Sequence, residues 1–272
     1  MGSNVTMVLG GGGMKGLAHI GVLKVLARHG ITPTQYVGTS VGSLIGALAA
    51  GGMAPEEIER LALSVRRAEI LDYDWLGMLL RRGRNRSIYR GKAYHDWVRR
   101  ILPVDRFDQV KRPLYVTTVN VNDGNEVVWG MPGLDDVPIH DAVVASCAVP
   151  GIYPPKQIRG HWFVDGGVVD PLPVRVAVYL KAAMIVAVNL DGDPPAGTGQ
   201  DAGLYDIMQR GQSLLSRTIT QFDLRYFRDI PIVLIEPKVQ LGLFQFDGLE
   251  ECIRAGERAA ELAVANHPLL AA

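Results

Sequence analysis

Ser40 stands between two glycines, Gly38 and Gly42, where an apolar run gives way to a run of small residues. The residues before it predict a buried strand and residues 44–50 predict a helix. Gly-x-Ser-x-Gly in this setting is typical of the nucleophile elbow, a sharp turn that exposes a serine hydroxyl. Larger flanking side chains would collide across such a turn. The pattern predicts a nucleophile at Ser40, and the alternative is an ordinary turn in a chain with 31 glycines.

A second glycine-rich segment, residues 10–16, follows the first predicted strand. Its Gly-x-Gly-x-x-Gly spacing matches a dinucleotide-binding loop, but that loop needs a carboxylate about 20 positions later, and the first in this chain is Glu56. A P-loop needs lysine followed by serine or threonine, whereas Lys15 is followed by Gly16. The remaining interpretation is an anion cradle of exposed amides at a helix N-terminus. Beside a serine on a neighbouring strand it would be an oxyanion hole.

A serine nucleophile needs a base within hydrogen-bond reach, and two candidates stand out. In a conventional Ser–His–Asp hydrolase with the serine first, His267 would be the base, although the end of the last helix explains its position more simply. Asp165 ends an apolar predicted strand directly before two glycines, as a residue does at the active edge of a parallel sheet. Its simpler role is to accept backbone N–H groups in its own turn.

The elements that would position these residues begin as strand, helix, strand and helix, which predicts a parallel sheet with right-handed crossovers. The chain is therefore expected to be of the α/β class. The later predicted elements are a hairpin over residues 113–129, strands over 158–164, 184–190 and 231–235, helices over 139–148, 174–181 and 249–267, and a long amphipathic helix from Leu204.

Length and composition narrow the alternatives. The 272 residues are expected to form one domain, residues 1–272, and a net charge of zero gives no electrostatic reason to expect nucleic acid. Two cysteines, Cys147 and Cys252, are too few for a disulfide framework or a zinc cluster, so we expect a reducing, cytoplasmic compartment. The N-terminus does not resemble a signal peptide, and no apolar run is long enough for a membrane-spanning helix.

Residues 66–112 are locally basic, with 13 Lys and Arg against six Asp and Glu. Tyr73 and Trp75 lie among them, and aromatic side chains beside arginines suit a surface that contacts anionic lipid. A solvated basic face over a packed subdomain is the simpler interpretation.

Three blocks in this order resemble the patatin-like phospholipase family of the compact bacterial kind: residues 11–16, residues 38–42 and residues 165–167. Residues 145–151 and 171–173 extend the resemblance, which covers about residues 5–260. It implies a three-layer α/β/α fold with a mainly parallel central sheet, in a single catalytic domain. It also implies a Ser–Asp dyad of Ser40 and Asp165 without histidine, and an oxyanion hole made of the amides of Gly11, Gly12 and Gly13.

The resemblance further implies hydrolysis of fatty-acyl esters of phospholipids, lysophospholipids or other lipids through an acyl-serine, with no metal or other cofactor. The expected partner is thus a lipid or fatty-acyl ester substrate, with peripheral contact to a membrane as an additional expectation and no nucleic acid. The alternatives are a conventional Ser–His–Asp carboxylesterase and a non-catalytic lipid-binding relative. Cys147 precedes the predicted site closely, yet a small buried residue is its simpler role.

Overall fold

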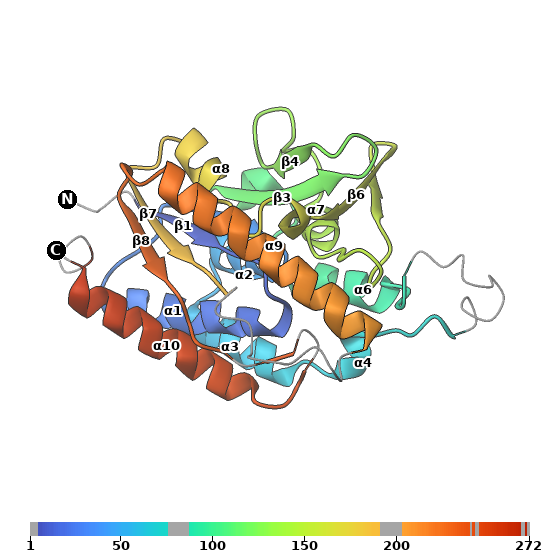
Figure 1. Ribbon diagram of the computed structural model, residues 1–272, viewed down its shortest axis with the longest axis horizontal. Helices are drawn as coiled ribbons and strands as arrows, with labels where there is room; N and C mark the ends of the chain where they lie inside the picture. Colours follow the sequence, from blue (N-terminus) through green and yellow to red (C-terminus); the bar gives the residue numbers. More distant parts are fainter. Residues whose placement is uncertain are drawn as a thin grey trace.

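The computed structural model describes residues 5–75, 87–190, 203–239, 241–242, 245–267 and 270, and its centre is one eight-stranded sheet (Figure 1). The strand order is β5-β6-β3-β2-β1-β7-β8, and β4 pairs with β3. The five parallel strands are β1 (Val5–Leu9), β2 (Gln35–Thr39), β3 (Leu114–Asn120), β7 (Met184–Val188) and β8 (Ile232–Ile235). The antiparallel pairs involve β4 (Glu126–Trp129), β5 (Lys156–Ile158) and β6 (His161–Asp165).

The central strand β1 is buried on both faces because helices cover both sides of the sheet. Its alternate side chains Val5, Met7 and Leu9 enter the larger core, and Val8 enters the smaller one. The larger core includes α1 (Leu17–Arg28), α2 (Val41–Ala50), α7 (Ile139–Ser146) and α10 (Leu249–Asn266). The smaller core lies under α8 (Val174–Tyr179) and α9 (Leu204–Tyr226), and Figure 1 shows α9 crossing diagonally in front of the sheet. This is the predicted three-layer arrangement, with a mainly parallel sheet.

Two further helices extend the larger core away from the sheet. These are α3 (Pro55–Ser64) and α6 (Lys92–Ile101), with the short α4 (Arg67–Ile70) beside α6. Ile58 of α3 and Val98 of α6 are fully buried, so part of the basic segment 66–112 does cover a packed subdomain. Residues 76–86 of that segment lie outside the described residues. The described residues also form three short 3₁₀ turns: η1 (Gly13–Gly16), η2 (Phe107–Gln109) and η3 (Gly166–Val168).

The predicted strand over residues 158–164 is instead the centre of a hairpin. Lys156–Ile158 and His161–Asp165 pair antiparallel, and the turn between them places Arg159 and Gly160 at φ 50° and 81°. Glycine adopts a positive φ at no cost, but arginine seldom does, and that arginine hid the turn from the sequence. The hairpin over residues 113–129 is confirmed as β3 and β4.

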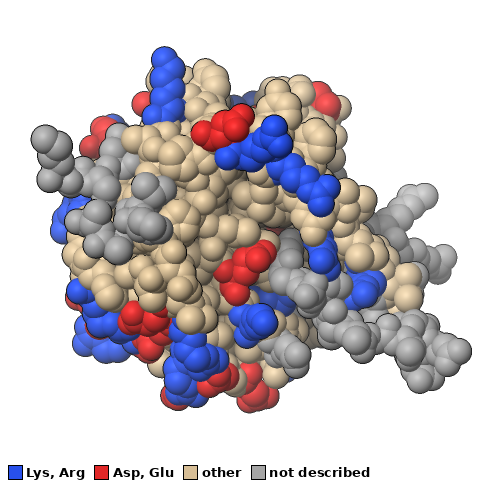
Figure 2. Space-filling view, turned by 60° about the vertical axis from the view of Figure 1, so that its left-hand side comes forward, with Lys and Arg blue, Asp and Glu red and all other residues tan. Residues whose placement is uncertain are grey.

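Charge is distributed as the composition suggests. On the face drawn in Figure 2, Lys and Arg side chains lie beside Asp and Glu side chains along the lower edge, in keeping with a net charge of zero. Among the described helices, none combines the length and the apolar composition that crossing a bilayer requires.

Candidate active site

Strand β3 brings Ser40 and Asp165 together, because two strands meet end to end along one of its edges. Thr117 of β3 pairs with Thr39, the last residue of β2, and Thr118 pairs with Asp165, the last residue of β6. β4 occupies the opposite edge at both positions. The C-terminal ends of β2 and β6 therefore point at each other, and Ser40 follows directly after Thr39. The sequence predicts Asp165 at the end of a strand of a parallel sheet, and the structure places it at the end of a strand that runs antiparallel to β3.

The backbone at Ser40 has the strained geometry of an elbow. Its φ and ψ are 55° and −131°, a combination that costs a non-glycine residue of the order of 1–3 kcal/mol. A Cβ on Gly38 would lie 2.6 Å from backbone atoms of Gly42 and Ser43, and a Cβ on Gly42 would lie 2.1 Å from the carbonyl oxygen of Leu9. Both flanking glycines are thus required by close backbone approach, as the sequence predicts.

Asp165 is a buried carboxyl group with few hydrogen-bond donors. Its exposed fraction is 5%, and its Oδ1 accepts the amide of Gly167 at 2.8 Å. Burial raises the pKa of Asp165 to about 6, against the lowering effect of hydrogen bonds from the Ser40 side chain and the Gly167 amide. A carboxylate with this pKa is ionised at pH 7 and is a stronger base than an ordinary aspartate. The interaction with Ser40 joins the two residues that the sequence singles out.

The glycine loop runs beside Ser40, but its three amides are not equivalent. A Cβ on Gly11 would lie 3.4 Å from the Cβ of Ser40, which places the loop against the serine. The Gly11 amide already donates to the carbonyl of Pro171 at 2.9 Å. Within the described part of the chain, the amides of Gly12 and Gly13 donate to no protein acceptor. Gly12 and Gly13 are the amides free to hold an oxyanion, and Gly11 can join them only if its bond to Pro171 opens.

An apolar cavity of about 100 Å³ begins at Ser40 and runs between α2, α3 and α6. Its polar lining is confined to the serine, two tyrosines and Cys147, and the remaining side chains are aliphatic or aromatic. They include Leu44, Leu48, Ile58, Leu61, Val65, Ile70 and Trp97. A narrow apolar space of this kind next to a nucleophile suits the hydrocarbon part of an ester.

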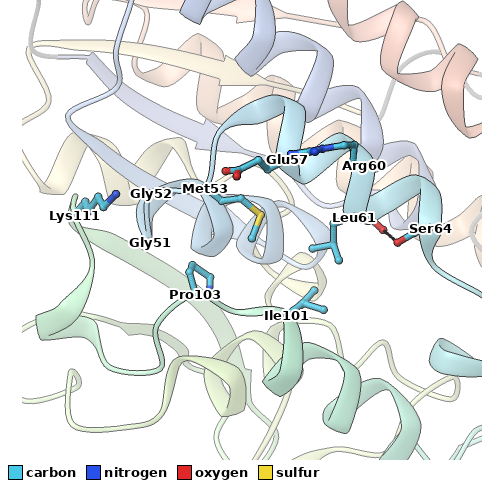
Figure 3. Close-up of a pocket in the computed structure, with 10 residues that line it drawn as sticks. All are labelled: Gly51, Gly52, Met53, Glu57, Arg60, Leu61, Ser64, Ile101, Pro103 and Lys111. Carbon is cyan, nitrogen blue, oxygen red and sulfur yellow. Dashed lines mark hydrogen bonds between the residues drawn. The ribbon is translucent and has the colours of Figure 1, made fainter.

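A larger hollow of about 630 Å³ lies on the other side of α3 (Figure 3). Charged side chains line it, among them Glu57, Arg60 and Lys111. Its one hydroxyl, Ser64, donates to the carbonyl of Leu61 within the same helix at 2.8 Å. Figure 3 shows Leu61 reaching from α3 toward Ile101, and Leu61 lines the apolar cavity as well. Among the described residues, no hydrogen bond joins Ser64 to a carboxylate or a histidine of this hollow, so it offers no catalytic pair.

The histidines do not complete a conventional triad in the described structure. No hydrogen bond or ion pair of the described residues joins any of the six to Ser40 or Asp165. Nε2 of His19 lies 2.8 Å from the carbonyl oxygen of Gly10, and burial lowers the pKa of His19 to about 4. His267 lies at the C-terminal end of α10, and its amide donates to the carbonyl of Ala263.

One group of side chains could hold a cation, at His95, His140 and Asp141, whose ligand atoms lie within 4.8 Å of one another. Nζ of Lys156 already contacts Oδ1 of Asp141 at 2.6 Å, and Nδ1 of His140 contacts Oδ1 of Asp105 at 2.6 Å. The Asp141 carboxylate is therefore already paired with a lysine, which a metal would have to displace. This is an ion-pair network between α6, α7 and β5.

Two residues of the block 145–151, Ser146 and Cys147, lie against Ser40. Oγ of Ser146, at the end of α7, accepts the amide of Ser40 at 2.8 Å and so holds the elbow from behind. Cys147 follows it, is buried, and interacts with the Ser40 side chain. Burial raises the pKa of this thiol to about 12, so it stays neutral and packs as a small side chain. Only the tertiary contact between α7 and α2 reveals the role of Ser146.

Comparisons with known proteins agree with this geometry. A sequence model described as "Patatin-like phospholipase" matches residues 7–178. A protein of Mycobacterium tuberculosis, described as an uncharacterized NTE family protein, is 31% identical over 198 residues, which cover 73% of this chain and 52% of the relative. The lysophospholipase NTE1 of Mycosarcoma maydis is 29% identical over 227 residues, covering 77% of this chain and 11% of the relative.

Among solved structures, VipD from Legionella pneumophila shares the fold with a TM-score of 0.64 at 12% identity, covering 97% of this chain and 67% of that one. The chain spans about half the length of the mycobacterial relative that it matches.

Proposed function

The chain belongs to the patatin-like phospholipase family, and we propose on this basis that it is a lipid acyl hydrolase in which Ser40 attacks the ester carbonyl and Asp165 accepts its proton. The observation that carries the proposal is the register on β3, which brings the C-terminal ends of β2 and β6 together and so sets Ser40 beside Asp165. The two residues would form the active site of a single catalytic domain. We expect a cytoplasmic location, with which two free, buried cysteines agree.

In the first half of the reaction, Oγ of Ser40 forms a bond to the carbonyl carbon while the hydroxyl proton passes to a carboxylate oxygen of Asp165. The carbonyl oxygen gains the negative charge, and the amides of Gly12 and Gly13, which donate to no protein acceptor among the described residues, would donate to it. The carbon–oxygen bond to the alcohol then breaks, and the leaving alkoxide takes the proton from Asp165. An acyl-serine remains.

In the second half, water attacks the acyl-serine and loses a proton to Asp165. The same amides hold the second oxyanion. When the bond to Ser40 breaks, the proton returns to its Oγ and the fatty acid leaves. The products are one alcohol and one acid for each water consumed, and no redox or metal step is needed for this balance.

The weak point of such a dyad is the basicity of aspartate, whose ordinary pKa is about 3.9. Burial raises the pKa of Asp165 to about 6. The difference between this pKa and that of the serine hydroxyl is therefore smaller by about two than for an ordinary aspartate. The remaining barrier must be lowered where the charge develops, and a single oxyanion donor is worth about 3–4 kcal/mol in enzymes where it has been removed. Two unengaged amides and the N-terminus of α2 would supply this stabilisation.

The substrate class follows from the cavity and the relatives. The apolar cavity beside Ser40 supports a fatty-acyl chain on the acid side of the ester. Relatives that include a fungal lysophospholipase favour a lysophospholipid or phospholipid as its source. The apolar cavity suits the acyl chain of a phospholipid and that of a neutral lipid alike, so both classes of ester are assayed.

The proposal is tested by assaying a panel of fatty-acyl esters, lysophospholipids and phospholipids with the wild-type protein, S40A and D165N. We expect turnover of at least one lipid ester by the wild type and its loss in both variants. S64A is the matched control, because Ser64 carries a hydroxyl in the other hollow, and it should keep full activity. A conventional triad requires activity to disappear with His267→Ala, and a non-catalytic lipid-binding protein requires no turnover by the wild type on any member of the panel.

A further inference from the structure

Helix α9 turns polar side chains toward the protein and apolar side chains toward solvent, whereas a helix that packs on a core does the opposite. The side chains that it buries are polar, namely Ser216, Thr220 and Asp223. Large apolar side chains face outward with exposed fractions between 47% and 70%: Ile207, Met208, Leu214, Leu215, Phe222 and Tyr226. The sequence predicts an amphipathic helix here with nearly the same apolar stripe, and such a stripe ordinarily packs inward. In this protein it faces away from the sheet.

Polar contacts hold α9 in this orientation. Asp223 lies 3.2 Å from Nε of Arg175 on α8, and Nε2 of Gln212 donates to the carbonyl of Gly167 at 3.4 Å. A helix that rolled to bury its apolar stripe would break both contacts and expose the buried Asp223. The outward stripe is therefore a built feature of the fold.

The stripe also adjoins the candidate active site. Gly167, which Gln212 contacts, donates its amide to Asp165. Val168, next in η3, is 39% exposed and adds to the apolar surface beside the helix. A lipid surface lying on α9 would thus lie near Gly167, whose amide donates to the carboxylate of Asp165.

The charges on α9 select one kind of occupant. Arg210 and Arg217 are seven residues apart and so follow the same border of the stripe, and the exposed Arg225 lies near it. An apolar stripe flanked by arginines on one helix is the pattern of a segment lying in the headgroup region of an anionic bilayer.

A second copy of the chain fits this surface less well. The stripe is about 30 Å long and about 10 Å wide, so pairing two stripes would bury about 600 Å² in all. Stable, specific protein interfaces bury more than about 1,000 Å². A bilayer needs no matched partner surface and can take up a narrow apolar strip.

We propose that the outward apolar stripe of α9 docks the protein on anionic lipid bilayers and places the Ser40–Asp165 pair at the lipid surface. This inference rests on the proposed function, because it names the partner that presents the substrate. It predicts binding to vesicles that does not depend on turnover.

The test is co-sedimentation with phosphatidylglycerol/phosphatidylcholine vesicles and with pure phosphatidylcholine vesicles. We expect S40A to bind the anionic vesicles as the wild type does, and binding to weaken at high salt. L215E and F222E should each lower the partition coefficient at least about tenfold, because each replaces a side chain that the bilayer would bury. L262E is the matched control, since Leu262 is an equally exposed leucine on α10, and it should bind normally.

The same variants are assayed on a short-chain ester in solution and on lipid in vesicles. L215E and F222E should keep the first activity and lose most of the second. Vesicle binding by F222E equal to that of the wild type would overturn the proposal. The proposal would also be overturned if the wild type were a dimer and F222E converted it to a monomer while lipid binding stayed unchanged. Failure of the proposed function looks different: neither ester would be hydrolysed, while S40A and the wild type could still bind vesicles alike.

Discussion

Lowering the pH should inactivate this protein in a way that identifies Asp165 as the base. Burial raises the pKa of Asp165 to about 6 from an ordinary value of 3.8. With that pKa, about nine-tenths of the carboxyl groups are ionised at pH 7 and slightly less than about one-tenth at pH 5, so kcat/KM should fall about tenfold between them. An unperturbed aspartate would still be more than about 90% ionised at pH 5, and the same change would leave the rate almost unaltered.

The assay is kcat/KM on a water-soluble short-chain ester from pH 4.5 to pH 9, with circular dichroism at each pH to show that the protein stays folded. The midpoint of the acid limb should lie near pH 6 and should stay there in H140N and H267N. A profile that is flat down to pH 5 would refute the basicity argument. A midpoint that disappears with either histidine would refute the dyad itself.

Three further outcomes follow from burial and close packing. D165N should be more stable than the wild type at pH 8 by up to about 3 kcal/mol in urea unfolding, because the raised pKa means that ionised, buried Asp165 costs stability above pH 6; equal stability would contradict this. His19, with its pKa lowered to about 4, should destabilise the fold by up to about 3 kcal/mol as the pH falls from 6.5 to 4, because only the unfolded chain takes up the proton in that range, and H19Q should lose this dependence. G42A should fail to give folded protein, since its Cβ would meet the carbonyl oxygen of Leu9 at 2.1 Å, whereas G211A, with nothing within 4 Å, should fold and melt no lower than the wild type.

The sequence predicts the parts of the site that depend on local geometry. The elbow at Ser40 can be recognised in a short segment, because the close backbone approach at Gly38 and Gly42 can be met only by glycine. Asp165 is predicted as the partner of Ser40 because it ends an apolar run before two glycines. The spacing of residues along the chain does not predict the register on β3. That register pairs Thr39 and Asp165 with neighbouring residues of the strand.

The features of the site that the sequence did not predict depend on contacts between segments far apart in the chain. The bond from the Gly11 amide to Pro171 takes one of the three expected oxyanion donors, and it joins residues 160 positions apart. Ser146 supports the elbow from another helix. The direction in which α9 turns its stripe depends on Arg175 and Gln212, since helical periodicity fixes which residues share a face but not which way that face points.

The most direct test of the central claim is to treat the protein with a fluorophosphonate probe and locate the adduct by mass spectrometry. The account predicts one adduct, on Ser40, that forms in the wild type, is absent from S40A, and forms at least about a hundredfold more slowly in D165N, within the range that a general base contributes. Labelling of another serine, or labelling of D165N at the wild-type rate, would contradict it.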